Sequence, residues 1–307
     1  MDAIKDISII FISIFFESLP FILLGSIISS IIETYISNET IAKLIPKNKI
    51  LASIVGVLLG FFIPACDCAV IPVSKRLLKK KVPINVAISF MLSSPIINPV
   101  VLLSTYYAFF NNNPKIFWLR IILGIIISLI IGVIISFIFK DNVIKEDVIK
   151  DDHDHENCDC DCHHDHHIKK HTLKNDFLSI IKHTSNDFFE VIKFLMIGAL
   201  IASIIQTLLP RSALLVFNDN QALSIITLMI FAYLISLCST SDSFIGKSLL
   251  SSFPKTAVVS YLLLGPMIDI KNTFVLLGNY DKKFVITLIS LIFIIIFISS
   301  MFMVMFI

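Results

Sequence analysis

Residues Gly25–Thr34 read GSIISSIIET, and a near copy, GALIASIIQT, occupies Gly198–Thr207 in the second half of the chain. The two stretches are identical at six of ten positions. Shared isoleucines carry little weight in so isoleucine-rich a chain. However, both copies are preceded at the same distance by a Phe-Phe-Glu tripeptide, which ends at Glu17 and at Glu190. The chain therefore contains an internal repeat, which indicates that its two halves adopt similar folds.

The repeat continues downstream in residue types that chance rarely aligns. With a small slip in spacing, the two halves match in order: Cys66 with Cys238, Lys75 with Lys247, Pro83 with Pro254, Pro95 with Pro266, and Asn98 with Asp269. We therefore expect two membrane repeats, residues 1–140 and 178–307, joined by a linker at 141–177. Two such repeats are typical of secondary transporters, whose substrate sites lie near the midplane where paired helices are broken.

The composition indicates a membrane protein. Of 307 residues, 56% are apolar and only 16% are charged, which is low for a soluble protein. Eight apolar segments come close to or exceed the roughly 20 residues that cross a bilayer as a helix. They are Ile7–Tyr35, Ile50–Ser74, Ile84–Phe110, Ile121–Phe139, Phe188–Leu209, Gln221–Ser241, Thr256–Tyr280 and Val285–Ile307. We expect an all-α polytopic membrane protein with about eight transmembrane helices in two pseudo-symmetric repeats.

The distribution of basic residues predicts the orientation, because Lys and Arg are enriched in cytoplasmic loops. One group follows the second segment or lies in the linker: Lys75, Arg76, Lys79, Lys80, Lys81, Lys140, Lys145, Lys150, Lys169, Lys170 and Lys174. Loops on the other side hold fewer: Lys43, Lys47, Lys49, Lys115, Arg120, Arg211, Lys282 and Lys283. If all eight segments cross the inner (cytoplasmic) membrane, we expect both termini and the linker in the cytoplasm. A re-entrant pair around residues 64–99 would make the repeats inverted instead of parallel, and both topologies stay open.

The N-terminal segment is too long for a signal peptide, and no small-residue cleavage pattern follows it, so we expect it to remain as a membrane helix. Elsewhere, prolines predict broken helices, since proline removes an amide donor and clashes with the preceding turn. They cluster in both halves: Pro64, Pro72, Pro83, Pro95, Pro99, Pro254 and Pro266. Unwound backbone is tolerated at membrane depth where it is buried in protein or lines a wet cavity. The prolines therefore point to a cavity.

The motif best suited to bind an ion is Cys66-Asp67-Cys68, which lies between Pro64 and Pro72. Extended backbone points alternate side chains the same way, so both thiols could face one ion. Buried free cysteine is often only small apolar filler, but the motif is echoed at Cys238. We expect Cys66, Cys68 and Cys238 to contact a metal or metalloid, with Asp67 lowering the ion's net charge or relaying a proton.

Three further polar residues lie in apolar surroundings: Asn98, Asp242 and Asp269. Ionisable groups inside a membrane are expensive and by default indicate a transport pathway or proton relay. Asn and Asp are also good caps for the ends of broken helices. Both roles are compatible, and we include all three residues in the expected transport pathway.

A polar island, DDHDHENCDCDCHHDHHIKKH, occupies residues 151–171. Thiolate and imidazole are the ligands that Zn²⁺ and Cu⁺ prefer. The expected ligands are His153, His155, Cys158, Cys160, Cys162, His163, His164, His166 and His167. Their spacing fits no zinc-finger pattern, and low hydrophobicity predicts disorder without metal. The island lies between the repeats and belongs to neither, so we interpret it as a cytosolic metal-gathering accessory.

Nothing in the chain indicates that it hydrolyses ATP. At the closest approach to a Walker A loop, before Gly246-Lys247-Ser248, Ser241 stands where the first glycine is required. The linker is also shorter than the roughly 50 residues of a small soluble domain. Ion-coupled transport is the leading expectation, with proton antiport favoured, and drive by a separate ATPase subunit stays open as an alternative.

The motifs also carry a family resemblance. Pro64-Ala-Cys-Asp-Cys-Ala-Val-Ile-Pro-Val, Ser93-Ser-Pro-Ile-Ile-Asn-Pro-Val and Leu264-Gly-Pro-Met-Ile-Asp-Ile-Lys resemble the predicted permease family that includes the organoarsenical efflux permeases. The His/Cys-rich central loop is similar to that of the subgroup described as copper/zinc efflux transporters. The resemblance implies an eight-segment permease that exports soft metals or metalloids.

The leading hypothesis is a non-enzymatic membrane exporter of Zn²⁺ or Cu⁺, with the ion as substrate, the bilayer as surroundings and no required cofactor. The island favours these ions over trivalent arsenic, which prefers thiolates to imidazole. The alternatives are an arsenite or organoarsenical efflux permease, a membrane thiol oxidoreductase that uses Cys66 and Cys68, and a membrane-anchored metal sensor. Nothing indicates nucleic acid as a partner. The oligomeric state stays open, with a homo-oligomer as one possibility.

Overall fold

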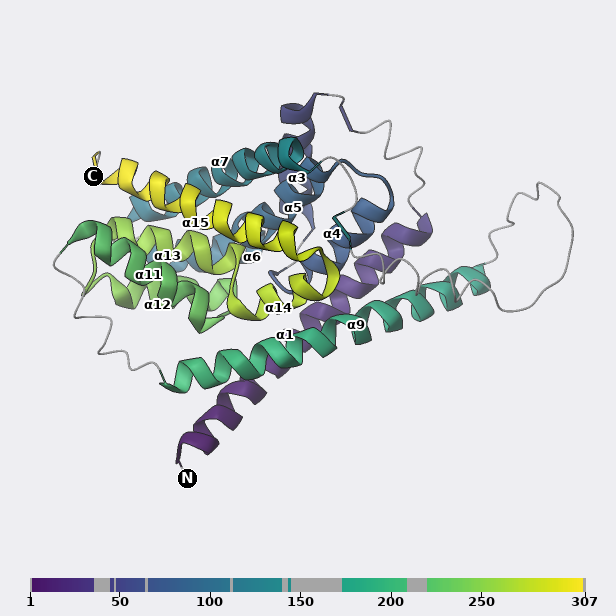
Figure 1. The fold of residues 1–307 in the computed structure, drawn as a ribbon, viewed down its shortest axis with the longest axis horizontal. Coiled ribbons are helices and arrows are strands. Elements are labelled where there is room, and N and C mark those ends of the chain that lie inside the picture. Colours follow the sequence, from purple (N-terminus) through teal and green to yellow (C-terminus); the bar gives the residue numbers. More distant parts are fainter. Residues whose placement is uncertain are drawn as a thin grey trace, which may run out of the picture.

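The helices of the described residues fall into two series of six with the same order (Figure 1). The computed structural model describes residues 2–35, 45–46, 48–63, 66–110, 113–139, 143–144, 173–208 and 220–305. The first series is α1 (Asp2–Tyr35), α3 (Lys49–Phe62), α4 (Val70–Lys79), α5 (Ile84–Ile97), α6 (Pro99–Phe109) and α7 (Pro114–Ile138). The second is α9 (Leu173–Leu208), α11 (Gln221–Ile235), α12 (Ser239–Leu249), α13 (Lys255–Met267), α14 (Ile270–Asn279) and α15 (Lys282–Val304). Apart from one isolated bridge, Ile144 with Tyr280, the described residues form no β-structure.

Each helix of the first series has a partner of nearly equal length in the second. The long helices α1 and α9 have 34 and 36 residues, and α3 and α11 have 14 and 15. The short pairs have 10 and 11 residues for α4 and α12, and 11 and 10 for α6 and α14. The repeat seen in the sequence therefore recurs in the fold, and the expected all-α polytopic architecture is confirmed.

All eight apolar segments contain helix, but they differ in length. Among the described residues, six stretches are long and apolar enough to cross a membrane: Ile4–Ile32, Ile84–Phe109, Pro114–Ile138, Thr184–Leu208, Lys255–Asn279 and Lys282–Val304. Two of these stretches are interrupted, α5–α6 at Asn98 and α13–α14 at Ile268-Asp269. The remaining apolar helices, α3 and α11, are shorter.

The chain turns back on itself after α3. The Asn85 side chain donates to the carbonyl of Lys49 (2.7 Å), and the Ser94 hydroxyl to that of Ile63 (3.4 Å). Because both contacts pair like ends of α3 and α5, these helices run parallel. The intervening α4 must therefore run in the opposite direction. Helices α3 and α4 form a re-entrant hairpin, which we call hairpin 1, with residues 66–69 at its tip.

The second repeat builds the same unit from α11 and α12, which we call hairpin 2. Gly265 lies against Asp242, and Gly246 lies against Leu262. Since residue numbers rise along α12 as they fall along α13, these two helices are antiparallel. The tip of hairpin 2 is formed by residues 236–238, between the end of α11 and the start of α12.

The two hairpins enter from opposite faces of the protein. Gly246, toward the base of hairpin 2, approaches Phe109 at the end of α6. Tyr280, after α14, instead lies against Ser74 of hairpin 1, with 2.8 Å between the hydroxyl oxygens. Among the described residues, each repeat therefore has three stretches long enough to cross and one hairpin. An odd number of crossings makes the repeats inverted, so the described helices favour the inverted one of the two topologies left open by the sequence.

The described helices do not support the prediction that both termini share a side with the linker, which assumed eight full crossings. Helix α1 is antiparallel to α9, since Thr184 contacts Ser30 (2.9 Å) whereas Ile14 packs with Ala199 and Ala202. With six crossings, the start of α1 and the end of α15 lie on one face, which we call the terminal face. The end of α7 and the start of α9 lie on the opposite one, the linker face (Figure 1).

Several cations assigned to loops from the sequence lie inside helices. Lys75 and Arg76 belong to α4 and are each about 3% exposed, and Arg120 belongs to α7 and is fully buried. Each of these side chains is held by polar partners within the protein. They therefore carry no information about the orientation in the membrane.

Two glycines of the repeated stretch allow close helix contacts, as small residues do between membrane helices. Gly25 of α1 lies against the backbone of Ala69 at the tip of hairpin 1. Gly198 of α9 lies against the backbone of Lys271 in α14. The repeated Gly thus lets each long helix approach the centre of the protein.

We expect Gly198→Val to destabilise the protein by about 1–3 kcal/mol, because an added Cβ overpacks a tight contact. That Cβ would lie 2.8 Å from both the Cα and the carbonyl oxygen of Lys271. The measurement is the melting temperature of the purified protein in detergent. Leu200→Val, at an exposed position of the same helix, is the matched control. A melting temperature equal to that of the control would contradict the close contact.

The inverted topology predicts that reporters on the two faces lie on opposite sides of the membrane. We expect a reporter enzyme that is active only outside the cytoplasm to differ in activity when it is inserted in the linker and when it is fused after Ile307. A fusion in the loop at Asn113, between α6 and α7, should behave like the C-terminal one. Equal activity of the linker and C-terminal fusions would show that the termini and the linker share a side.

Candidate functional site

The tips of the two hairpins meet in one small cavity. The cavity is lined by Ile14, Glu17, Ser18, Phe21, Cys66, Asp67, Cys68, Ser236, Cys238 and Lys271. These residues come from α1, from both hairpin tips and from the start of α14. The structure thus brings together four residues that the sequence placed on the transport pathway, Cys66, Asp67, Cys68 and Cys238. The volume of about 10 Å³ is close to that needed by one water molecule.

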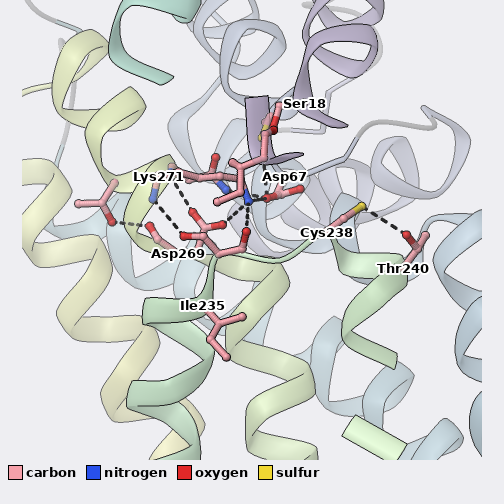
Figure 2. A network of polar contacts seen from close by, with 12 residues as sticks. Ser18, Asp67, Ile235, Cys238, Thr240, Asp269 and Lys271 are labelled. Carbon is pink, nitrogen blue, oxygen red and sulfur yellow. Dashed lines mark hydrogen bonds and ion pairs between the residues drawn. The ribbon is translucent and has the colours of Figure 1, made fainter. Parts of the chain in front are cut away.

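The Lys271 ammonium connects the parts of this site (Figure 2). Its Nζ lies 2.5 Å from Asp269 Oδ2 and 3.1 Å from Asp67 Oδ2. It also donates to the carbonyl of Ser236 at 3.3 Å. All three ionic side chains are at most 4% exposed. One buried cation therefore joins the tip of hairpin 1, the tip of hairpin 2 and the break between α13 and α14.

The breaks in the crossing helices are stabilised by side-chain caps. Asp269 accepts a hydrogen bond from the backbone amide of Asn272 (2.7 Å), and Asn98 accepts one from that of Val100 (3.0 Å). These bonds satisfy amides that the start of a helix leaves without a partner. The matched Asn98 and Asp269 are therefore caps at equivalent breaks, and Asp269 also binds Lys271.

A second hydrogen bond from the same segment fixes Asp67. The Asn272 side chain donates to Asp67 Oδ2 at 2.9 Å. Asp67 thus forms an ion pair with the Lys271 ammonium and accepts a hydrogen bond from the Asn272 side-chain amide, both at the start of α14. Hairpin 2 is tied in as well, since the Gln206 side chain of α9 donates to the carbonyl of Ile235.

The backbone at the tip of hairpin 2 adopts an unusual conformation. Ser236 has a φ of 50°, in the left-handed region, which is uncommon for a residue with a side chain. Its carbonyl accepts from Lys271, and its hydroxyl lies 3.4 Å from the Lys271 amide. Strained backbone of this kind persists where the surroundings fix it, and it clusters at functional sites.

The three described cysteines are free thiols. Cys68 lies 3.9 Å from both Ser18 Oγ and Asp67 Oδ2, and Cys238 lies 3.3 Å from Thr240 Oγ1. Within the part of the chain that the structure describes, no three His, Cys, Asp or Glu residues lie close enough together to hold a metal ion. In this conformation the thiols line a common cavity without forming a closed metal centre.

Asp242 does not reach the thiol cavity, although the sequence grouped it with Cys238. It accepts a hydrogen bond from the Tyr261 hydroxyl (3.0 Å). Nearby, the fully buried Arg120 donates to Thr105 and Ser243, both at 2.7 Å. Arg120 Nε and Asp242 Oδ2 have no hydrogen-bond partner among the described residues. This second polar cluster holds hairpin 2 against α6 and α7, on the terminal side of the break at Asn98.

The polar island, with its expected histidine and cysteine ligands from His153 to His167, lies outside the described residues. So does Pro64. Their predicted roles stay predictions.

Sequence reasoning missed Lys271, which is central to the site. The signal was available: Lys271 lies between the apolar runs 256–268 and 273–278, and a membrane-embedded cation requires a partner. Ser18 gave no signal, because serine is common in the first apolar segment. Glu17 ends the first copy of the repeated Phe-Phe-Glu tripeptide, and it lines the cavity from α1.

Residues 3–305 match a family described as a predicted permease. The chain belongs to this permease family. It is 42% identical over 292 residues to the UPF0718 protein YcgR of Bacillus subtilis (strain 168), covering 95% of each chain. It is 37% identical over 281 residues to a protein of Streptococcus mutans serotype c (strain ATCC 700610 / UA159), covering 92% of this chain and 89% of that one. That relative is named a putative two-component membrane permease complex subunit. No solved structure matches the chain.

Family membership confirms the transport class, and it points to a transporter in place of an enzyme. It does not identify the substrate. The fold agrees with this class, because it places broken helices and buried polar residues at the centre of a helical membrane protein.

We expect Lys271→Met to destabilise the protein by about 3–5 kcal/mol, because it leaves two buried carboxylates without their cation. Neutralising Asp67 and Asp269 to Asn in the same chain should recover most of that loss. Chemical unfolding of the purified protein in detergent measures both effects. Lys255→Met, at an exposed position of α13, serves as the control. The central role of Lys271 is refuted if Lys271→Met is as stable as the control.

Proposed function

We propose that this permease exports Zn²⁺ or Cu⁺ from the cytoplasm and that Cys66, Cys68 and Cys238 provide its thiol ligands. The observation that carries the proposal is the meeting of free thiols from the two repeats where both hairpin tips end. Thiolate ligands select Cu⁺ and Zn²⁺ over harder ions. A site shared between inverted repeats at the break of their helices is where a transporter binds its substrate.

Asp67 and Lys271 give the proposed site a means of exchanging cations. An arriving metal ion competes with the Lys271 ammonium for the Asp67 carboxylate, since the two groups are 3.1 Å apart. Displacement of the ammonium would free one carboxylate and loosen the contact between the hairpin tips. In this proposal Asp269 stays with Lys271, and Asn98 and Asp242 line the remainder of the pathway. The driving ion is proposed to be the proton.

The charge distribution supports a cytoplasmic linker face. Among the described residues, the cations near the ends of helices on that face are Lys49, Lys79, Lys80, Lys81, Lys282 and Lys283. Those toward the terminal face are Lys5, Lys115, Lys247 and Lys255. An excess of Lys and Arg marks the cytoplasmic side. We therefore place the polar island in the cytoplasm, where it would gather metal ions, and both termini outside.

Efflux of arsenite or an organoarsenical is the second candidate, and Lys271 favours it. A metal cation must displace the Lys271 ammonium from Asp67 to bind there, whereas a neutral trivalent arsenical need not. Trivalent arsenic also needs no imidazole ligand. The two candidates predict different roles for the island, which the export of zinc or copper uses and the export of arsenicals does not.

A deletion strain of the native host, complemented with variants, tests the proposal. This host also supplies a second subunit, should the chain work in a complex like the one named for its Streptococcus relative. The cells are challenged with Zn, Cu, arsenite and methylarsenite, and the accumulated element is measured. We expect wild type to lower the accumulation of zinc or copper, and Cys66→Ser to lose at least about tenfold of the transport rate, as loss of a ligand does at metal sites.

Ser248→Cys, added to the Cys66→Ser chain, returns one cysteine at an exposed position outside the cavity. This control should not rescue export. Deletion of residues 151–171 should weaken zinc or copper export while leaving the membrane part intact. Lower accumulation of arsenicals alone would establish the second candidate. Unchanged accumulation of all four elements, together with an altered thiol redox state of other membrane proteins, would instead indicate an oxidoreductase and overturn both.

A further inference from the structure

The two inverted repeats are alike in their helices but not in how the long helices pack against them. Helix α1 packs along α4, and α9 packs along α14. The two long helices α1 and α9, which we call the long pair, therefore cover the half of the core that faces the linker. In the other half, α12 packs against α6, and neither has extensive contact with α1 or α9 among the described residues. The long pair therefore closes one half of the core and leaves the other uncovered.

A cleft of about 300 Å³ marks the uncovered half. Its walls come from the start of α1 and the end of α9 on one side, and from α11, the tip of hairpin 2 and α12 on the other: Ile10, Ile205, Gln206, Phe231, Leu234, Ile235, Leu237 and Ile245. The cleft lies toward the terminal face. The described helices are thus packed together toward the linker face and leave a cleft toward the terminal face.

Ion pairs hold the closed half together. Lys75 Nζ of α4 lies 2.7 Å from both carboxylate oxygens of Glu190 in α9. The Lys75 side chain is 4% exposed and that of Glu190 is 30% exposed. A buried ammonium in a membrane protein requires such a partner. This contact joins hairpin 1 of the first repeat to the long helix of the second.

The repeat assigns a counterpart to each member of this pair. Lys75 matches Lys247 of α12, and Glu190 matches Glu17 of α1. Both counterparts are exposed, and neither makes an ion pair with any described residue. They belong to the two elements whose separation leaves the terminal half uncovered. The same chemical pair therefore occurs twice, once formed and once apart.

We propose that Lys247 and Glu17 form the ion pair that closes the terminal half in the second conformation of the transport cycle, when Lys75 and Glu190 separate. In an inverted-repeat transporter, the second conformation is obtained when the two repeats exchange their packing. The long pair would then cover α12 and α6 in place of α4 and α14. One Lys–Glu pair forms as the other breaks, so the exchange keeps the number of ion pairs among these four residues constant.

This proposal does not depend on the transported substrate, because none of its observations uses the thiols. Lys75, Glu190, Lys247 and Glu17 act as positioning residues for the reorientation of the protein. The proposal fails or stands independently of the metal-export proposal.

Crosslinking across the linker tests it. Glu17→Cys and Lys247→Cys are combined in the full chain, which carries an inserted protease site between residues 151 and 171. A short bifunctional maleimide is used, since truncating Lys and Glu to Cys leaves more space than a disulfide spans. After cleavage, only crosslinked molecules keep both halves together on a denaturing gel. The chain with its native cysteines alone and the two single variants give the background.

We expect a low yield in the double variant and a rise of about tenfold when Glu190→Gln is added, because that change removes an ion pair present in one conformation only. Lys255→Gln, which neutralises an exposed charge outside both pairs, should leave the yield unchanged. Lys75→Gln breaks the same pair from its other side and replaces Glu190→Gln if that variant does not accumulate in the membrane. A yield at background in every variant, or one that Lys255→Gln raises equally, overturns the proposal.

Discussion

The contact on which the centre of the protein depends is that of the Lys271 ammonium with Asp67 and Asp269. An ammonium at this depth is stable only with compensating charge, and its two carboxylates come from different repeats. The same lysine binds the Ser236 carbonyl, so both hairpin tips are held at one point. The position of the thiols follows from this, because Cys66 and Cys68 flank Asp67 in the chain.

Much of the fold could be predicted from the sequence because its signals are local. Apolar length marks the membrane segments, prolines and capping residues mark the breaks at Asn98 and Asp269, and matched residues mark the repeat. The re-entrant hairpins could not be predicted in this way. Segment 50–74 is long enough to cross, and only the parallel packing of α3 on α5, through Asn85 and Ser94, shows that it turns back. That difference reversed the expected side of both termini.

The same division applies to the site. Cys66, Asp67, Cys68 and Cys238 were grouped from the sequence, and they line one cavity. Asp242 was grouped with them, but it lies one helical turn beyond Cys238 and faces Tyr261 and Gly265 of α13. Asp242 lies apart from the thiols because its side chain leaves α12 in another direction, which the spacing along the chain does not reveal. Lys271 belongs to no metal-ligand motif, and its importance comes from the charges that it neutralises.

One ion pair of the closed half has no counterpart in the repeat. Arg76 binds Asp187 through Nη2 at 2.8 Å and Nε at 3.2 Å, and Ser29 donates to the same carboxylate at 2.9 Å. The residues at the matching positions are Ser248 and Ile14, which cannot form such a pair. Two identical halves would rest equally in either orientation. In the proposed reorientation, the unmatched Arg–Asp pair would favour the conformation that is closed toward the linker face, so leaving that conformation would require a driving force.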